Sequence, residues 1–203
     1  MRFSIIIPAH NVEEYISKAL SSVKSQVFSD YECIVVCDAC TDKTEDIVHS
    51  YPFNVRIVHY QSAGLTRNVG LDLAQGEYIL FLDADDWYLH EYVLSEINNR
   101  LGDEDIFCFG FIWKGVGYAG PTNPEGRLYP HVWNKCFKRS FIGNLRFPDA
   151  TDEDACFHEA IMKQEPKIEM CDAPMIYYNF LREGSTSKKL QRTVQGAKSW
   201  WHI

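Results

Sequence analysis

Short apolar runs alternate with amphipathic segments along the first hundred residues. The runs have the length and the β-branched content of buried strands, and we predict strands over 3–7, 32–37, 55–59 and 78–82. Between and after them apolar residues recur at helical spacing, which predicts helices over about 15–23, 42–50, 64–74 and 89–101. Strands that alternate with helices form right-handed crossovers, so we predict an α/β fold with a mostly parallel central sheet flanked by helices.

The pattern changes after residue 105. An aromatic run at 106–113 predicts a strand, whereas 115–130 holds four glycines and three prolines and predicts a long loop. Further on we predict a strand over 133–138, a helix over 151–162 and an extended segment over 175–180. Long loops in compact domains usually serve function, so substrate selection is expected from 115–130.

Composition and charge exclude several classes of protein. A chain of 203 residues that is 46% hydrophobic can bury one sizeable core. The net charge of −8 argues against binding of nucleic acid. Apolar runs are too short for a transmembrane helix, and the N-terminal run stops at Pro8, too early for a signal peptide. We therefore expect a cytoplasmic protein.

The strand at 78–82 runs directly into three carboxylates, Asp83, Asp85 and Asp86. Alternate side chains of an extended chain share a face, so Asp83 and Asp85 are expected to project together beyond the carboxyl end of the strand. Two adjacent carboxylates repel each other unless a hard cation such as Mg²⁺ or Mn²⁺ lies between them. The alternative is a simple turn in which the aspartates cap the following helix.

The seven cysteines are an odd number and are scattered over the chain, which fits reduced thiols better than a disulfide framework. Cys37 and Cys40 form a C-x-x-C motif after a predicted strand, a spacing also found in redox pairs. A thiol redox or binding protein built on this pair is therefore one alternative function. Most of the other cysteines are expected to be small core residues.

Five segments in register, 4–11, 35–42, 64–70, 76–87 and 151–157, together resemble the family 2 glycosyltransferases. The resemblance runs from residue 3 to about 187. It implies the GT-A, Rossmann-like fold and transfer of a sugar from a nucleotide-diphosphate donor to an acceptor hydroxyl, with inversion. It also implies Mn²⁺ or Mg²⁺ as cofactor and a saccharide or lipid-linked saccharide as acceptor.

The resemblance assigns the donor site residue by residue. Pro8 matches the position whose backbone contacts the base, Asp38 lies in the segment that reads the base or ribose, and Arg67 matches an arginine near base and phosphates. Asp83 lies at the nucleotide-sugar and metal position, and Arg182 matches a segment that folds over the donor. The chain departs from the family at Cys37, where an acid is usual, and a thiol accepts hydrogen bonds poorly.

The same resemblance assigns the chemistry. Asp85 is the expected direct metal ligand, together with Asp83, and Asp154 matches the catalytic base, which has to take the proton of the acceptor hydroxyl. The alternative is a structural role, because acids near a helix start are favoured by the helix dipole whatever their function. Asp152 and Glu153 are the next candidates for the base. Trp133 and Lys135 resemble a W-x-K element that could form the base of the acceptor site, and a core position for Trp133 is the alternative.

By this resemblance 1–187 is one glycosyltransferase domain, with a nucleotide-binding half at 1–101 and an acceptor-binding half at 102–187. The remaining 188–203 predicts a basic, amphipathic helical tail. It is interpreted as a peripheral contact with the inner membrane surface, as packing on the domain, or as a remnant of a longer chain. A sugar-nucleotide nucleotidyltransferase is a further alternative, although the glycine-rich loop expected of it after the first strand is missing.

Overall fold

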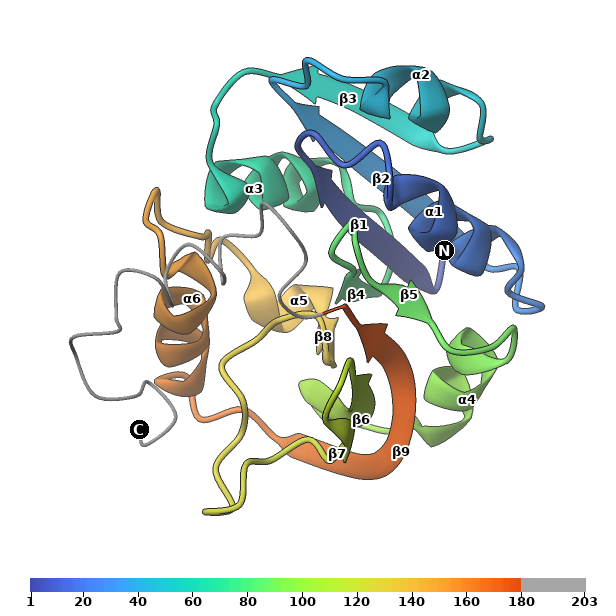
Figure 1. Ribbon diagram of the computed structural model, residues 1–203. Helices are drawn as coiled ribbons and strands as arrows, with labels where there is room; N and C mark the ends of the chain where they lie inside the picture. The colour runs from blue at the N-terminus through green and yellow to red at the C-terminus, as the bar shows by residue number, and fades with distance from the viewer. Residues whose placement is uncertain (180–203) are drawn as a thin grey trace.

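A computed structural model describes residues 1–179 of the chain, and Figure 1 shows their arrangement. The strands are β1 (Phe3–Ala9), β2 (Tyr31–Asp38), β3 (Asn54–Val58), β4 (Tyr78–Phe81), β5 (Trp87–Tyr88), β6 (Ile106–Trp113), β7 (Gly117–Ala119), β8 (Lys135–Lys138) and β9 (Ile168–Tyr178). The helices are α1 (Ile16–Lys24), α2 (Thr44–His49), α3 (Ala63–Leu73), α4 (Val93–Arg100), α5 (Arg139–Ile142) and α6 (Glu153–Met162). No helix in this part of the chain is long and apolar enough to cross a membrane.

The first four strands form a parallel half-sheet in the order β3-β2-β1-β4. In its register, Ile5 of β1 lies opposite Cys33 of β2 on one side and Leu80 of β4 on the other. The strand order therefore reverses at β1, and open α/β sheets bind ligands in the crevice beyond the carboxyl ends at such a reversal. The predicted α/β fold with a parallel core is confirmed.

The second half of the sheet is mixed. Beyond β4 the order continues through β8, β6, β9 and β5, and β7 pairs with β6. The β6–β9 pair is parallel, whereas β4–β8, β6–β8 and β5–β9 are antiparallel. Figure 1 shows β9 curving across this half and ending near β5. The curl brings segments that follow residue 105 close to the end of β4.

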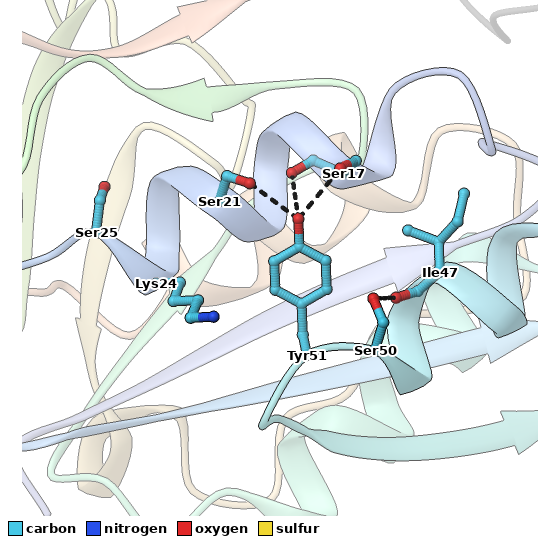
Figure 2. Close-up of a pocket in the computed structure, with 7 residues that line it drawn as sticks. All are labelled: Ser17, Ser21, Lys24, Ser25, Ile47, Ser50 and Tyr51. Carbon is cyan, nitrogen blue, oxygen red and sulfur yellow. Dashed lines mark hydrogen bonds between the residues drawn. The ribbon is translucent and has the colours of Figure 1, made fainter.

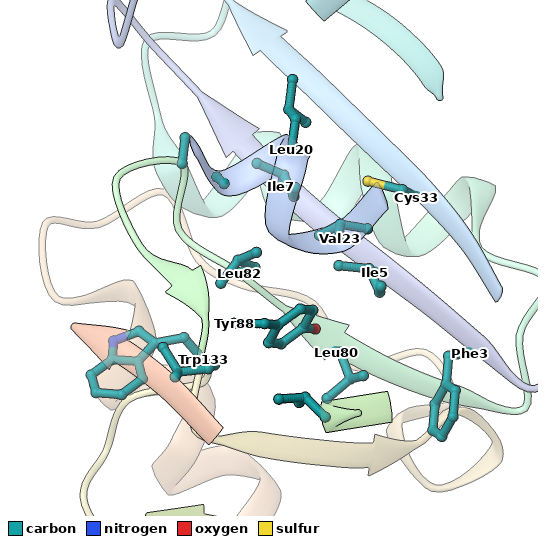
Figure 3. Packing of buried hydrophobic residues seen from close by; sticks show 14 of the residues in the cluster. Phe3, Ile5, Ile7, Leu20, Val23, Cys33, Leu80, Leu82, Tyr88 and Trp133 are labelled. Carbon is teal, nitrogen blue, oxygen red and sulfur yellow. The ribbon is translucent and has the colours of Figure 1, made fainter. Parts of the chain in front are cut away.

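Two apolar cores cover the two faces of the parallel half, because alternate residues of a strand point to opposite faces. Ile5 and Ile7 of β1 lie beside Leu20 and Val23 of α1, as Figure 3 shows, and Phe3 belongs to the same core. Ile6 points to the other face and belongs to a core that includes residues of α3 and α6. The two cores hold the carboxyl ends of the strands in fixed positions.

Several predicted boundaries differ from the structure. The helix predicted from residue 89 begins at Val93, because Trp87 and Tyr88 pair with β9. The strand predicted over 133–138 begins at Lys135, and the last strand begins at Ile168 rather than at 175. The loop predicted over 115–130 contains β7, which forms a hairpin with β6. These strands depend on distant partners, which local periodicity does not reveal.

Candidate active site

Asp38 ends β2 and is almost fully buried, with 3% of its surface exposed. Its carboxylate accepts hydrogen bonds from the backbone N–H groups of Gln61 (2.9 Å) and Ser62 (3.0 Å) and from the hydroxyl of Thr66 (2.7 Å). Burial by itself would raise the pKa of Asp38, but these hydrogen bonds outweigh it and lower the pKa. The carboxylate ties β2 to the start of α3, and a contact with ribose stays a prediction.

Pro8 lies next to the end of β1, opposite Val36 of β2. The loops that follow β1 and β2 are joined by hydrogen bonds: the side-chain oxygen of Asn11 accepts from the backbone N–H of Thr41 at 2.8 Å. Further bonds join Glu13 N–H to Asp42, Lys43 N–H to Glu13, and Val12 N–H to Thr44. The two loops therefore form one wall at the carboxyl edge of the sheet, where the base is predicted to bind.

Arg67 of α3 connects the predicted metal segment to the predicted catalytic helix. Its guanidinium bonds to Asp83 at 2.8 Å and to Glu153 at 2.7 Å, and it lies 3.5 Å from Asp154. The side chain is only 5% exposed. The structure therefore brings together three residues that the sequence assigned to one site, Arg67, Asp83 and Asp154.

The electrostatics of this cluster keep the guanidinium charged. Burial would lower the pKa of Arg67, but the carboxylates of Asp154, Asp83 and Glu153 outweigh it and raise the pKa. Burial raises the pKa of Glu153, an effect that Arg67 opposes. These charged groups have lost much of their hydration and are stabilised by one another instead. Loss of the arginine would leave the carboxylates without the positive charge that compensates for their burial.

The carboxylate of Asp154 makes few hydrogen bonds among the described residues. Its Oδ2 atom receives only a long hydrogen bond of 3.5 Å from the N–H of Val132. Its buried Oδ1 atom has no hydrogen bond among residues 1–179, only the 3.5 Å ionic contact with Arg67. Glu153, by contrast, is engaged in the short bond to Arg67, and Asp152 is exposed at the helix start. Asp154 as the base stays a prediction.

Asp83 and Asp85 directly follow β4 and remain partly accessible. Within residues 1–179 no group of three or more His, Cys, Asp or Glu side chains could hold a metal. Mg²⁺ and Mn²⁺ are commonly held by one or two carboxylates and completed by substrate phosphates, so the pair fits such an ion. Asp86 has another role: it is buried, and it accepts a 2.8 Å hydrogen bond from the N–H of Asn179.

The structure places both residues of the W-x-K element inside the protein. Trp133 is 2% exposed and stacks against Tyr178 and His131, with ring centroids 4.6 and 5.0 Å away. The Lys135 ammonium donates to the carbonyl oxygens of Tyr129 (2.6 Å) and His131 (2.5 Å). In this conformation the two side chains support the preceding loop, and direct contact with an acceptor would require that loop to open. Their acceptor role stays a prediction.

A hollow of about 690 Å³ is lined by residues of α1 and α2 and by the residues that follow these helices. Figure 2 shows the Tyr51 hydroxyl bonded to Ser17 and Ser21 at its wall. None of the residues predicted for the donor, acceptor or metal lines it. It therefore adds nothing to the candidate site.

Two predictions concern residues outside 1–179, namely Arg182 and the tail at 188–203, and they remain predictions.

The sequence did not single out Thr66, which bonds Asp38, and named Glu153 only as a substitute base. Arg67 and Glu153 are separated by 86 residues, so no local pattern signals their pairing. The one signal in the sequence is the run of three acids at 152–154, since adjacent carboxylates that become buried need a cation nearby.

Comparison with known proteins decides the family. Residues 4–166 match the model of glycosyl transferase family 2. The chain belongs to this family. Among its curated relatives is the poly(ribitol-phosphate) beta-N-acetylglucosaminyltransferase TarS of Staphylococcus aureus strain Mu50, which is 38% identical over 209 residues. That match covers 91% of this chain and 36% of TarS.

A second relative of this family 2 chain is the minor teichoic acid biosynthesis protein GgaB of Bacillus subtilis (strain 168). It is 28% identical over 228 residues, which cover 98% of the chain and 25% of GgaB. The chain thus spans about a quarter to a third of these two relatives.

Solved structures share the fold. The crystal structure of S. aureus TarS 1-349 in complex with UDP-GlcNAc superposes with a TM-score of 0.80 at 25% identity, and the match covers 93% of this chain and 61% of that one. The mannosyltransferase PcManGT from Pyrobaculum calidifontis, in complex with GDP-Man and Mn²⁺, gives a TM-score of 0.73 at 17% identity. Here 94% of this chain and 60% of that chain are covered, and the likeness concerns the fold alone.

Proposed function

We propose that this family 2 chain transfers a sugar from a nucleoside-diphosphate donor to a hydroxyl group of a saccharide acceptor, with inversion at the anomeric carbon. The observation that carries the proposal is the contact of Arg67 with Asp83 on one side and with Glu153 and Asp154 on the other. This contact would hold the predicted metal-binding segment and the predicted base in a fixed position relative to each other. Transfer of a sugar between two bound substrates requires such an arrangement.

Residues 1–101 are proposed as the nucleotide-binding half and 102–187 as the acceptor-binding half. The donor would lie over the carboxyl ends of β1, β2 and β4, where Pro8, Asp38 and Asp83 are placed. The structure of the relative TarS in complex with UDP-GlcNAc makes a uridine-diphosphate sugar the first donor to test. The relatives named for teichoic acid biosynthesis and poly(ribitol-phosphate) support a cell-surface polymer as acceptor.

Asp154 is proposed to accept the proton of the attacking hydroxyl. Its Oδ1 atom is buried without a hydrogen bond among the described residues, so an acceptor hydroxyl would satisfy it. Attack on the face of the anomeric carbon opposite the leaving diphosphate inverts the configuration. Positioned acid–base groups of this kind contribute about 10²- to 10⁴-fold in rate.

Asp85, with Asp83 beside it, would hold Mn²⁺ or Mg²⁺. When bound, the ion would offset the charge that develops on the departing diphosphate. Oδ1 of Asp83 accepts a hydrogen bond from Arg67, and the family resemblance makes Asp85 the direct ligand to test first. The Mn²⁺ named with structural neighbours of the same fold supports a divalent cation.

The metal assignment is tested by calorimetric titration of UDP with Mn²⁺ and with a chelator. We expect the native protein to bind UDP at least about tenfold more tightly with Mn²⁺, a difference of about 1.4 kcal/mol. Asp85→Ala should lose this difference. Asp72→Ala serves as a matched control, because Asp72 pairs with Arg146 at the surface. Equal affinity with and without chelator in the native protein contradicts the assignment.

A further inference from the structure

Two cysteines, Cys37 and Cys40, lie at the wall formed by the loops after β1 and β2, where the base is predicted to bind. Cys37 lies opposite Ala9 in the sheet and is fully buried, whereas Cys40, two residues beyond the end of β2, is half-buried. Between them Ala39 adopts a left-handed conformation with φ of 49°. This sharp turn folds the chain back toward β1, so both cysteines lie beside Ala9: Cys37 pairs with it across the sheet, and the Cys40 thiol donates to its carbonyl oxygen.

Cys40 links the two loops of this wall. Its thiol donates to the carbonyl oxygen of Ala9, the last residue of β1, at 3.5 Å. The residue after Cys40, Thr41, donates its backbone N–H to the side chain of Asn11. A chemical change at Cys40 would therefore act on both loops at once.

The environment makes Cys40 the more reactive thiol. The hydrogen bond from Cys37 lowers the pKa of Cys40 to about 7, against the opposing effect of burial. The same hydrogen bond, together with burial, raises the pKa of Cys37. Thiolates are the nucleophiles in thiol oxidation, so Cys40 would react first and Cys37 would resolve the product.

We propose that Cys37 and Cys40 form a dithiol site that a peroxide converts to a disulfide, and that this disulfide weakens binding of the nucleoside diphosphate. The effect on binding rests on the proposed function; the site itself does not. In the first step the Cys40 thiolate attacks the peroxide O–O bond, giving a sulfenic acid and releasing hydroxide. In the second the Cys37 thiol attacks that sulfur, and the S–S bond forms as water leaves. Both sulfurs are oxidised, and one peroxide is reduced to two molecules of water.

The link to nucleotide binding is geometric. A disulfide needs a sulfur–sulfur distance of about 2.05 Å, shorter than any hydrogen bond between thiols. Cys37 is held in the sheet and in the core, so Cys40 has to move toward it. That movement breaks the hydrogen bond from Cys40 to Ala9 and shifts one loop against the other.

The test treats the full chain with hydrogen peroxide and maps disulfides by mass spectrometry. We expect one peptide pair joined through Cys37 and Cys40, two hydrogen atoms lighter than the reduced form. UDP affinity in Mn²⁺ should fall by about tenfold or more, which is about 1.4 kcal/mol, and recover with dithiothreitol. Cys40→Ser should keep its own starting affinity after peroxide. Cys171→Ser, which removes a half-buried thiol on β9, should remain as sensitive as the native protein.

The outcomes are separable. If no Cys37–Cys40 disulfide forms, the dithiol site is overturned. If the disulfide forms and UDP affinity is unchanged, the coupling to the nucleotide site is overturned. Failure of the reduced protein to bind UDP would overturn the proposed function and with it the effect on binding, while the mapped disulfide would still decide whether the dithiol site exists.

Discussion

At the scale of single residues, the charge balance of the site depends on Arg67. One guanidinium, almost without solvent, bonds to Asp83 and Glu153 and lies near Asp154. Buried charges are tolerated only when they are paired, so this arginine determines whether the carboxylates can stay ionised together. It is thus a positioning residue as well as a candidate donor ligand.

Replacing Arg67 should therefore cost stability even without substrate. We expect Arg67→Ala to lower the free energy of unfolding by about 3 kcal/mol, the lower end of the range for breaking a buried ion pair, because Asp83 is partly exposed. Urea denaturation measures the change. The matched control is Arg146→Ala, whose exposed pair with Asp72 is worth less than about 1 kcal/mol. Equal losses of unfolding free energy in the two variants would show that the buried ion pairs of Arg67 stabilise the protein no more than an exposed pair does.

The role of Asp154 is a second prediction at this scale. Asp154→Asn keeps the shape of the side chain and removes its proton affinity, so donor binding should change little while kcat falls by about 10²- to 10⁴-fold. Initial rates and UDP titrations separate the two quantities. Asp152→Asn, at the exposed start of the same helix, should leave kcat unchanged. Turnover of Asp154→Asn close to the native value would move the base to Glu153.

At the scale of elements, the packing of α3 on β1 positions Arg67. Gly70 lies one turn after Arg67 on α3, and a Cβ atom at this glycine would overlap the side chain of Ile6 in β1. The close approach of helix and strand thus requires a residue without a side chain. This contact fixes how far the guanidinium reaches toward the carboxylates.

Gly70→Ala is expected to destabilise the protein despite the better helix propensity of alanine. Propensity favours alanine by about 1 kcal/mol, whereas overpacking of a core costs about 1–3 kcal/mol. We expect a net loss in urea denaturation and a weaker UDP affinity. Gly102→Ala is the control, because its new Cβ would meet only the flexible carboxylate of Glu104. An unchanged unfolding midpoint for Gly70→Ala would refute the packing argument.

At the scale of the whole molecule, the curled half of the sheet encloses polar groups that respond to pH. Burial lowers the pKa of His131 to about 3 and of His158 to about 4, with a further contribution from the charge of Lys135. Both folded pKa values lie below the pKa of a histidine in the unfolded chain, about 6.5. Between the folded pKa values and about pH 6.5, the unfolded chain therefore binds more protons than the folded protein. Stability from these groups is complete above about pH 6.5 and is lost as the pH falls toward the folded values.

His131→Phe should reduce this acid sensitivity. Phenylalanine keeps the stacking on Trp133 and cannot bind a proton. We expect the urea midpoint of the native protein to drop between about pH 7 and about pH 5, and that of His131→Phe to drop less. The exposed His49→Phe variant should behave like the native protein. Identical pH profiles for His131→Phe and the native protein would exclude His131 as a source of the acid sensitivity.

Local pattern determined much of this protein. Short apolar runs and helical spacing predicted β1 to β4 and the helices between them, and Asp83 and Asp85 were predicted just beyond the end of a buried strand, where they lie. These features depend on residues that are neighbours along the chain. The same local order, together with the family motifs, was enough to predict an α/β fold and family 2.

Tertiary structure decided the rest, because contacts between distant residues leave no local signal. The pairing of β5 with β9 shortened the helix expected from residue 89, and the aromatic neighbours of Trp133 decided that its ring is buried. Arg67 and Glu153 met only through the packing of α3 near α6, across 86 residues of sequence. The sequence alone named the charged groups of the site, and long-range packing determined which of them neutralise one another.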